Sequence, residues 1–265
     1  MDILHAIYLA VLQGLTEFLP ISSSGHLILL PHLFNWADQG LAFDVAVHLG
    51  SLLAVITYFR SELYLLGRDW LAHVGGGSLT QHGRLAWGMI VATFPVIIAA
   101  FFFEDIIETE LRQVVPIALA TIFFGLLIWW FDARRNEDRD EHSMAWCDII
   151  IIGFAQVLAL IPGTSRSGIT IAAGLAVGLS RPAAARFSFL LSIPVIFLAS
   201  AWQFLKLLEN DYSLAWSVLA VGTVVSAISA YLCIHFFLKL IQRIGFLPFV
   251  IYRIFLGAAL LYYFA

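Results

Sequence analysis

Two stretches of this sequence share an unusual layout, in which an apolar run carrying an amide is broken by a proline and followed by a hydroxyl-rich turn. The first is Gln13–His26 and the second is Gln156–Thr170. Aligning Gly25 with Gly168 gives an offset of 143 residues (168 minus 25). A broken helix at membrane depth is tolerated only where its freed backbone is buried in protein or lines a wet cavity, and paired breaks in two halves mark a binding site. The two turns are therefore predicted to form one active site.

The composition indicates a membrane protein with several spans. Of the 265 residues 61% are hydrophobic and only 12% are charged, whereas a soluble domain is about half apolar and about one quarter charged. The net charge of −4 offers no general basic face, and no motif for reading nucleic acid is present. Nucleic acid is therefore excluded as a partner.

The hydrophobic pattern predicts an all-α integral membrane protein with two similar halves. Residues 1–131 would form the first half, 132–148 a charged cytoplasmic linker and 149–265 the second half. Each half would hold one re-entrant helical hairpin, at 3–34 and at 149–179, because the broken runs are too short and polar for ordinary spans of about 20 apolar residues. Three full spans follow each hairpin, at Leu41–Phe59, Leu85–Phe103, Val114–Phe131, Phe187–Leu205, Trp216–Phe237 and Phe246–Phe264.

Three spans is an odd number, so the second half must enter the bilayer from the side opposite to the first, giving an inverted-topology repeat. Loop charge tests this arrangement. Lys and Arg gather in the predicted wet loop Arg60–Arg84, in the linker and around Lys239 and Arg243, and are sparse in the other loops. The positive-inside rule places the first set in the cytoplasm. Both termini are then expected outside.

The first turn brings together a carboxylate, hydroxyls and an imidazole. Gln13 and Glu17 are four residues apart and share a helix face. A carboxylate inside a membrane segment indicates a functional site, although Glu17 could instead reach water at the interface and Gln13 could be a structural amide. The serines from Ser22 onward, with His26, predict a loop in which serine is a nucleophile or phosphate ligand and histidine the acid or base. The alternative is a polar turn with an N-cap serine.

The second turn carries the clearest anion signal. Arg166 lies between apolar segments, and its guanidinium fork suits bidentate phosphate binding. Ser165, Ser167 and Thr170 surround it at the start of a helix, where backbone amides favour an anion. The alternative for Arg166 is a structural salt bridge to Glu17, which is compatible with a site.

Other polar groups are predicted to support these two turns. Asp44 and His48, one helical turn apart on the first span, would lie behind the reacting groups together with Gln13 and Gln156. His48 serves equally as a hydrogen-bonded interior histidine, and Arg253 in the last span is expected to pair inside the bundle. A carboxylate facing a phosphate repels it unless Mg²⁺ or Ca²⁺ lies between them, or unless Glu17 pairs with Arg166. Glu17, and Gln13 with it, are the expected metal ligands.

The two motifs of this sequence resemble those of a known family. Gln-Gly-Leu-Thr-Glu-Phe-Leu-Pro-Ile-Ser-Ser-Ser-Gly-His and Pro-Gly-Thr-Ser-Arg-Ser-Gly-Ile-Thr are similar to the two signatures of undecaprenyl-pyrophosphate phosphatase, the bacitracin-resistance protein family, and the similarity runs nearly end to end through Phe187–Leu191 and Tyr252-Arg253. One position departs: the family has Glu or Gln first in its first motif, and Gln13 here leaves one carboxylate fewer for a cation.

The resemblance implies a bacterial plasma-membrane enzyme that removes one phosphate from a C55 isoprenyl pyrophosphate, regenerating the lipid carrier for peptidoglycan synthesis and conferring bacitracin resistance. It implies hairpins that meet at mid-membrane, a site reached from the periplasmic side and a divalent-cation requirement, and it leaves a homodimer open. The family's functional positions fall on Glu17, Ser23, His26, Ser165, Arg166, Ser167 and Thr170.

The mechanism expected from these residues begins with the pyrophosphate held by Arg166 and the hydroxyls around it. Ser23 would attack the terminal phosphorus with His26 as acid/base, or His26 would attack with Ser23 as donor, and Glu17 would place the cation or orient His26. The rival prediction is a polyprenyl-phosphate carrier, because inverted repeats with broken helices are typical of transporters. A soluble-type acid phosphatase embedded in the membrane is a weaker third reading, because the lysine-led motif and the downstream His and Asp that it needs are missing from the sequence.

Overall fold

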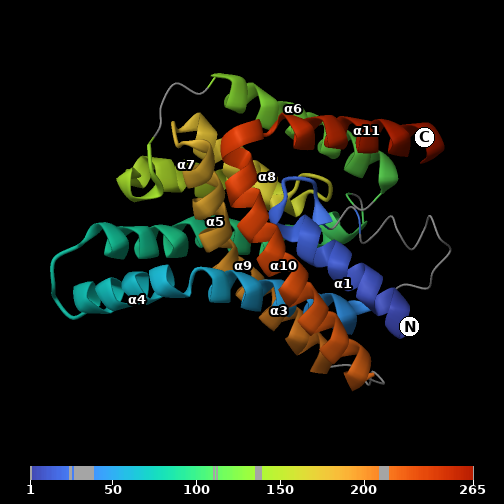
Figure 1. Ribbon diagram of the computed structural model, residues 1–265, viewed down its shortest axis with the longest axis horizontal. Coiled ribbons are helices and arrows are strands. Elements are labelled where there is room, and N and C mark those ends of the chain that lie inside the picture. Colours follow the sequence, from blue (N-terminus) through green and yellow to red (C-terminus); the bar gives the residue numbers. More distant parts are fainter. Residues whose placement is uncertain are drawn as a thin grey trace.

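The computed structural model describes residues 2–23, 26, 39–109, 111, 113–134, 139–208 and 215–264, and most of them are helical (Figure 1). Within this part of the chain, one isolated bridge joins Arg139 to Leu179. Two short 3-10 turns, η1 (Glu141–Ser143) and η2 (Leu158–Leu160), accompany the α-helices. The helices, with the labels of Figure 1, are α1 (Ile3–Phe18), α3 (Leu41–Tyr58), α4 (Arg60–Val74), α5 (Gln81–Thr109), α6 (Val114–Arg134), α7 (Trp146–Val157), α8 (Arg166–Ala176), α9 (Arg181–Leu208), α10 (Trp216–Ile244) and α11 (Leu247–Phe264).

Six of the described helices are long and apolar enough to cross a membrane, namely α3, α5, α6, α9, α10 and α11. They coincide with the six predicted spans, so the prediction of an all-helical, multi-pass membrane protein is confirmed. The other apolar helices, α1 and the segment Trp146–Leu160, are shorter. The first limb of each predicted hairpin is thus a short helix. Residues 27–34, predicted as the returning limb of the first hairpin, lie outside the described residues.

The two short apolar helices end where the sequence predicted breaks. Asp2 caps the start of α1, accepting a hydrogen bond from the backbone N–H of Leu4 at 3.0 Å. At its end Leu19 is extended, with φ −71° and ψ 143°, because the ring of Pro20 disfavours helical geometry in the residue before it. The second break follows η2, where Gly163 has φ +92° and a Cβ there would lie 2.4 Å from the carbonyl oxygen of Ile117. Only glycine fits that position.

Each short helix packs on a long helix from the other half of the sequence. Helix α1 lies against α10, and α7 lies against α5. The contact of α1 is close, because a Cβ on Gly14 would lie 2.6 Å from the Ser226 carbonyl oxygen. Small residues at such crossings allow helices in a membrane to approach closely. Helices α6 and α11 run side by side along one edge of the molecule (Figure 1). The two sequence halves are therefore intertwined.

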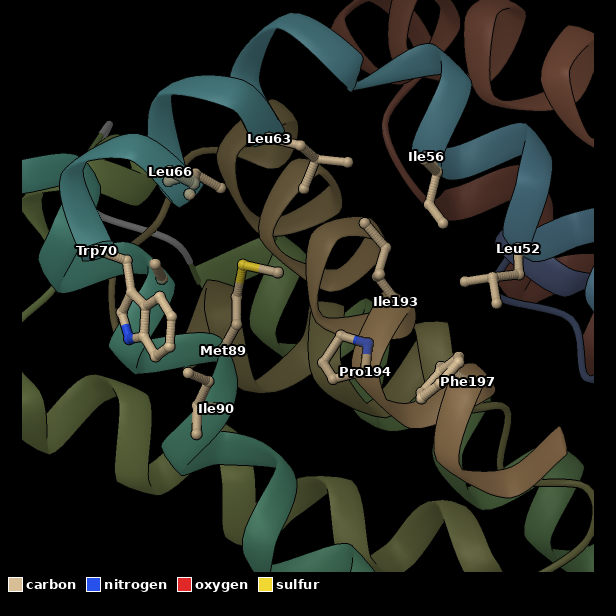
Figure 2. A pocket seen from close by; sticks show the side chains of 12 residues that line it. Leu52, Ile56, Leu63, Leu66, Trp70, Met89, Ile90, Ile193, Pro194 and Phe197 are labelled. Carbon is tan, nitrogen blue, oxygen red and sulfur yellow. The ribbon is translucent and has the colours of Figure 1, made fainter. Parts of the chain in front are cut away.

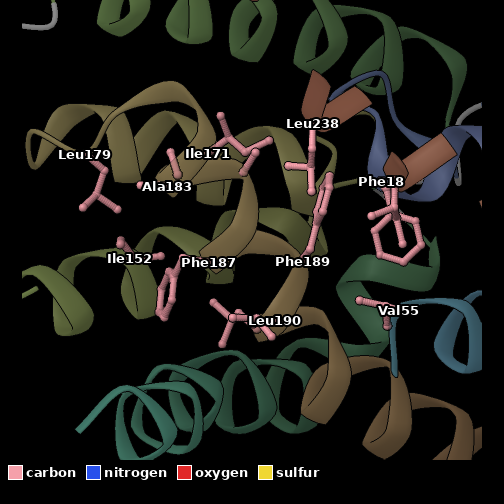
Figure 3. Packing of buried hydrophobic residues seen from close by; sticks show 14 of the residues in the cluster. Phe18, Val55, Ile152, Ile171, Leu179, Ala183, Phe187, Phe189, Leu190 and Leu238 are labelled. Atoms are coloured by element: carbon pink, nitrogen blue, oxygen red, sulfur yellow. The ribbon is translucent and has the colours of Figure 1, made fainter. Parts of the chain in front are cut away.

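Helix α9 lies at the centre of the main apolar core. Its residues Phe187, Phe189 and Leu190 are almost completely buried and contact side chains from α3, α7, α8 and α10 (Figure 3). Phe18, at the end of α1, meets Phe189 edge to face with ring centroids 5.1 Å apart. Edge-to-face aromatic pairs add about 0.5–1.5 kcal/mol beyond the burial of their area. This core fixes the end of α1 against α9, which helps to position the first turn.

The region predicted as the wet loop Arg60–Arg84 is mostly helical, so that prediction was wrong. Helix α4 covers Arg60–Val74, and its apolar residues Leu63, Leu66 and Trp70 recur at helical spacing. This pattern gives the helix one apolar face, which packs on α5. Asp69 then holds the following turn, accepting hydrogen bonds from the Thr80 hydroxyl and the Arg68 guanidinium, both at 2.8 Å. These two donors hold the pKa of Asp69 below its usual value.

The predicted linker 132–148 is shorter in the structure. Helix α6 continues to Arg134, and α7 already begins at Trp146. The start of α7 is fixed by Asp148, whose carboxylate accepts from the backbone N–H of Ala145 at 2.9 Å and pairs with Arg139 at 2.7 Å. Residues 135–138 lie outside the described residues. Asp148 therefore both caps α7 and pairs with a charged residue of the predicted linker.

Candidate active site

The two turns of the repeat meet through one buried ion pair. Glu17 lies in the last turn of α1, and Arg166 is the first residue of α8. Nη2 of Arg166 lies 3.0 Å from Oε1 of Glu17, and the two side chains are 13% and 8% exposed. The salt bridge between Arg166 and Glu17, which the sequence predicted as an alternative, is therefore present in the structure. It joins residues that are 149 positions apart. It brings a carboxylate and a guanidinium from separate turns to one point.

Glu17 is the centre of a hydrogen-bonded network. Its Oε2 atom accepts from the amide nitrogen of Gln13 and from the hydroxyl of Ser23, each at 2.9 Å. The Nε2 atom of His48 lies 3.8 Å from the same oxygen. The shared helix face predicted for Gln13 and Glu17 is thus confirmed. Both carboxylate oxygens are engaged, and Ser23 is held by Glu17.

The hydroxyls of the second turn form a second network beside Arg166. Ser165 caps α8, since its Oγ accepts from the Gly168 N–H at 3.1 Å, and it lies 3.1 Å from the hydroxyl of Ser167. Ser167 donates across to the Leu19 carbonyl of the first turn at 2.9 Å. Thr170 donates to the Arg166 carbonyl and contacts the Ser188 hydroxyl on α9 at 2.7 Å. These hydroxyls are close to the ion pair, and a bound anion would compete for them.

Both turns contain a serine in a left-handed backbone conformation. Ser22 has φ 73° and Ser165 has φ 71°, and they are the two non-glycine residues with positive φ in the described part of the chain. Their positions differ by 143 (165 minus 22), the offset of the sequence repeat. Residues other than glycine held in this region cost about 1–3 kcal/mol, and such strain clusters at functional sites. The local geometry thus matches at equivalent positions of the two turns.

His26 faces away from Ser23 in its hydrogen bonding. Its Nδ1 atom lies 2.6 Å from the carbonyl oxygen of Ser22, and its Nε2 atom lies 2.5 Å from the hydroxyl of Tyr252 on α11. The two rings are stacked, with centroids 5.7 Å apart and planes 7° apart. Both ring nitrogens therefore have partners other than Ser23.

Arg253 contributes more to this region than the sequence suggested. Its side chain is completely buried and donates four hydrogen bonds to backbone carbonyls, those of Pro20, Thr121, Gly163 and Thr164, at 2.9–3.1 Å. It thus holds the first turn, the second turn and α6 together. The expected intramembrane pairing takes the form of carbonyl contacts in the described residues. The sequence signal for a role of Arg253 was a lone cation in an apolar span. The partners of Arg253 could not be predicted, because they are backbone carbonyls that no motif marks.

The groups predicted to support the site divide into two sets. His48 joins the network directly, and its Nδ1 bonds to the backbone carbonyl of Asp44 at 2.7 Å. The Asp44 carboxylate accepts from Gln39 at 3.0 Å. Gln156 donates to the carbonyl of Ala92 on α5 at 3.2 Å, so it fixes α7 to α5 rather than contacting the ion pair.

The donor set suits an anion more than a resident metal ion. Glu17 supplies one carboxylate, and the amide oxygen of Gln13 is buried without a hydrogen-bond partner in the described structure. Two oxygen ligands fit part of a hard-cation shell, which needs about six to eight. The acidic group elsewhere, Glu62 with Glu141 and His142, already has the guanidinium of Arg186 bound to both carboxylates.

Two cavities in the described structure are apolar and lie outside this polar cluster. One, of about 350 Å³, lies between α3, α4, α5 and α9, and its lining includes Leu52, Trp70, Met89 and Phe197 (Figure 2). The other, of about 530 Å³, lies between α5 and α9 and reaches Leu160, shortly before the second turn. Cavities of this kind accommodate hydrocarbon rather than phosphate. The candidate site is therefore identified from its polar groups.

Comparison with known proteins extends the similarity over the whole chain. Residues 6–259 match the family described as bacitracin resistance protein BacA. Undecaprenyl-diphosphatase 2 of Stutzerimonas stutzeri is 58% identical, covering 100% of this chain and 99% of that protein. The undecaprenyl-diphosphatases of Nitrosococcus oceani and Thioalkalivibrio sulfidiphilus are 54% and 53% identical, each over the full length of both chains. The chain therefore belongs to the bacitracin resistance protein BacA family.

Proposed function

We propose that this protein is an undecaprenyl-diphosphatase of the bacterial plasma membrane. It hydrolyses undecaprenyl pyrophosphate to undecaprenyl phosphate and inorganic phosphate, and so returns the lipid carrier to cell-wall synthesis and confers resistance to bacitracin. The full-length similarity to undecaprenyl-diphosphatases supports this function. The observation that carries it is the buried Glu17–Arg166 pair with the Ser23 hydroxyl bonded to its carboxylate.

The pyrophosphate binds where the two turns meet. The guanidinium of Arg166 gives up part of its contact with Glu17 and binds the phosphate oxygens. Its planar fork of N–H donors stabilises the charge that develops in the transition state. The hydroxyls of Ser165, Ser167 and Thr170 exchange their present partners for phosphate oxygens, and the Ser22 hydroxyl of the first turn also binds the phosphate. The polyprenyl tail lies among the spans, and the apolar cavity that reaches Leu160 offers space for part of it.

Ser23 is the proposed nucleophile. Its Oγ attacks the terminal phosphorus, the bond from phosphorus to the bridging oxygen breaks, and undecaprenyl phosphate leaves. The sequence predicts that His26 accepts the serine proton, but in the structure Ser23 bonds to Glu17, and His26 bonds to Ser22 and Tyr252. We therefore assign that proton to Glu17. Phosphoryl transfer passes through a loose transition state and depends mainly on positioning and charge, so a carboxylate is a sufficient base.

His26 takes part in the second step. Water hydrolyses the phosphoserine, its oxygen forms the new bond to phosphorus, and the Ser23 oxygen leaves with the proton that Glu17 held. The imidazole of His26 accepts the proton of the water and later returns it to solvent. In the variant where His26 is the nucleophile, its Nε2 atom must first leave the Tyr252 hydroxyl.

A divalent cation, Mg²⁺ or Ca²⁺, would be held by Glu17 and by the amide oxygen of Gln13. These two residues leave most of its oxygen shell open, so the phosphate oxygens of the substrate would supply further ligands. When bound, the cation offsets the repulsion between the carboxylate and the phosphates.

Replacing Gln13 with glutamate is expected to strengthen cation binding. A second carboxylate beside Glu17 adds charge that attracts the cation, so the Mg²⁺ or Ca²⁺ concentration that gives half-maximal phosphate release should fall about tenfold, equivalent to about 1.4 kcal/mol. The matched control is Gln81→Glu, which adds the same charge at an exposed position at the start of α5. An unchanged or higher half-maximal concentration in Gln13→Glu would remove position 13 from the cation site.

The fold is proposed to be an inverted repeat of residues 1–131 and 149–265, each with a re-entrant hairpin and three spans. The matched strain at Ser22 and Ser165 and the packing of each short helix on the opposite half support this. Both termini and the access to the site would lie outside. Exposed Cys147 should then resist an impermeant maleimide in intact cells, whereas Ala215→Cys, in a Cys147→Ser background, should react. Reaction of Cys147 in intact cells would reverse the orientation.

A carrier that moves the lipid without chemistry is the alternative function, favoured by the broken-helix pattern. Purified protein in detergent, incubated with undecaprenyl pyrophosphate, separates the two by the mass of the lipid product. The enzyme converts the lipid to a species that has lost one phosphate and releases an equal amount of inorganic phosphate. Recovery of unchanged lipid from protein that binds it would leave only the carrier.

A further inference from the structure

His26 is held from both sides by groups of fixed hydrogen-bonding character. The carbonyl oxygen of Ser22 can only accept, and it lies 2.6 Å from Nδ1, so Nδ1 must carry a hydrogen. In the neutral ring the other nitrogen is then an acceptor. The Tyr252 hydroxyl, 2.5 Å from Nε2, must therefore donate to it. The two contacts together select one tautomer, with the basic lone pair on Nε2.

The phenol can also remain bonded when His26 gains a proton. Protonated histidine donates from both nitrogens, and a hydroxyl can accept as well as donate. In this change the phenol gives its hydrogen to Nε2 and receives the proton of the water in its place, while Nδ1 still donates to Ser22. Stacking of the two rings, at 5.7 Å and 7°, keeps the imidazole plane in place in both states. Tyr252 thus suits a histidine that must cycle between the two forms.

The position of Tyr252 is fixed by the next residue along α11. Arg253 is completely buried and donates to carbonyls of both turns, at Pro20, Gly163 and Thr164. The helix that carries the phenol is therefore anchored to the same two turns that carry Glu17 and Arg166. Tyr252 itself is 42% exposed, so its ring is not a core residue whose main role is packing.

We propose that Tyr252 links His26 to the attacking water: together with Ser22 it holds the imidazole in the Nδ1–H tautomer, and its hydroxyl passes a proton to Nε2 while it takes the proton of the attacking water in its place. This inference rests on the proposed function, since His26 has an acid/base role only in that reaction. In the described part of the chain the His26 ring hydrogen-bonds to Ser22 and Tyr252, and the charged group that acts on it is the guanidinium of Arg253.

The test compares Tyr252→Phe with Tyr262→Phe, which removes the same hydroxyl from an 83% exposed site on the same helix. Phosphate release from undecaprenyl pyrophosphate by the full-length protein is measured across pH. Tyr252→Phe should lower kcat about ten- to a hundredfold, the scale of a misplaced catalytic group, with KM unchanged and a changed pH profile of kcat. Tyr262→Phe should match the wild type. An unchanged kcat and pH profile in Tyr252→Phe, or a fall explained by a higher KM, would overturn the inference.

A second readout is independent of activity. In protein labelled with ¹⁵N-histidine, the His26 resonances, assigned by their loss in His26→Gln, should report the Nδ1–H tautomer in the wild type, and in Tyr252→Phe the Nε2 resonance should shift because that nitrogen loses its hydrogen-bond donor. Identical His26 signals in both proteins would overturn the inference. A wild type that releases no phosphate would instead overturn the proposed function, and the resonances would still decide whether Tyr252 fixes the imidazole.

Discussion

Replacing Arg166 with alanine is expected to lower kcat/KM for undecaprenyl pyrophosphate by about 10³- to 10⁵-fold, the range observed when an arginine that stabilises a phosphoryl-transfer transition state is lost. The guanidinium is the cation that reaches the first turn from the second, through its contact with Glu17. Arg166→Lys should recover only part of the activity, because an ammonium group keeps the charge but lacks the planar fork. Steady-state phosphate release measures both variants.

Loss of fold must be separated from loss of chemistry in this variant. Removing one partner of a buried ion pair costs about 3–5 kcal/mol, because the other charge stays buried without compensation. Arg181→Ala is the matched control, since it breaks the pair of Arg181 with Asp132, whose side chains are 23% and 9% exposed. Arg181 is the first residue of α9 and follows the end of α8 opposite to Arg166. It should lower thermal stability in detergent and leave kcat/KM unchanged. An equal loss of kcat/KM in both variants would remove the catalytic role of Arg166.

Replacing Ser23 with alanine is expected to lower kcat by about 10³-fold or more, as removal of an enzymatic nucleophile does. The hydroxyl is half-buried and bonded to Glu17, so its removal costs one hydrogen bond and little packing. Turnover quenched with acid should yield a phosphorylated peptide containing Ser23 from the wild type and none from the variant. Ser192→Ala, a buried hydroxyl on α9 that bonds to the Phe189 carbonyl, should retain wild-type activity.

The trapped peptide also decides between the two nucleophiles. A phosphate on His26, with Ser23 unlabelled, would establish the variant mechanism and contradict the assignment of Ser23. Phosphohistidine is lost in acid and kept in base, so both quenches are needed. If neither residue is labelled under either condition while turnover continues, hydrolysis proceeds by direct attack of water.

Much of the architecture follows from local sequence pattern. Long apolar runs with at most one charged residue each predicted all six spans, because backbone groups in lipid must be satisfied within a helix. Pro20 and Pro162 predicted the two breaks, because a proline disfavours helical geometry in the residue before it. The pairing of Glu17 with Arg166 was also open to prediction, since opposite charges inside a membrane seek each other. The helical nature of α4 was missed because Leu63, Leu66 and Trp70 alternate with charged residues, which lowers the mean hydropathy of the segment.

The rest of the site depends on packing between distant segments. Tyr252 and Arg253 reach the first turn across 226 and 233 positions of sequence, and no periodicity or motif specifies that the last span lies beside both breaks. Sequence proximity also suggested a Ser23–His26 pair, since the two residues are three positions apart. In the structure Ser23 bonds to Glu17, because Ser22 adopts a left-handed conformation and bonds to the His26 ring through its carbonyl. That local geometry is set by the surrounding helices.

The most direct test of the proposed site is phosphate release from undecaprenyl pyrophosphate by three purified proteins, the wild type, Glu17→Gln and Arg166→Ala, with farnesyl pyrophosphate as a short-chain comparison. If one site is assembled from both turns, the wild type releases phosphate and each variant loses nearly all of it, although one substitution lies in the first turn and the other in the second. Phosphate release that survives in either variant, with the protein folded, would contradict the proposal that both turns form one active site.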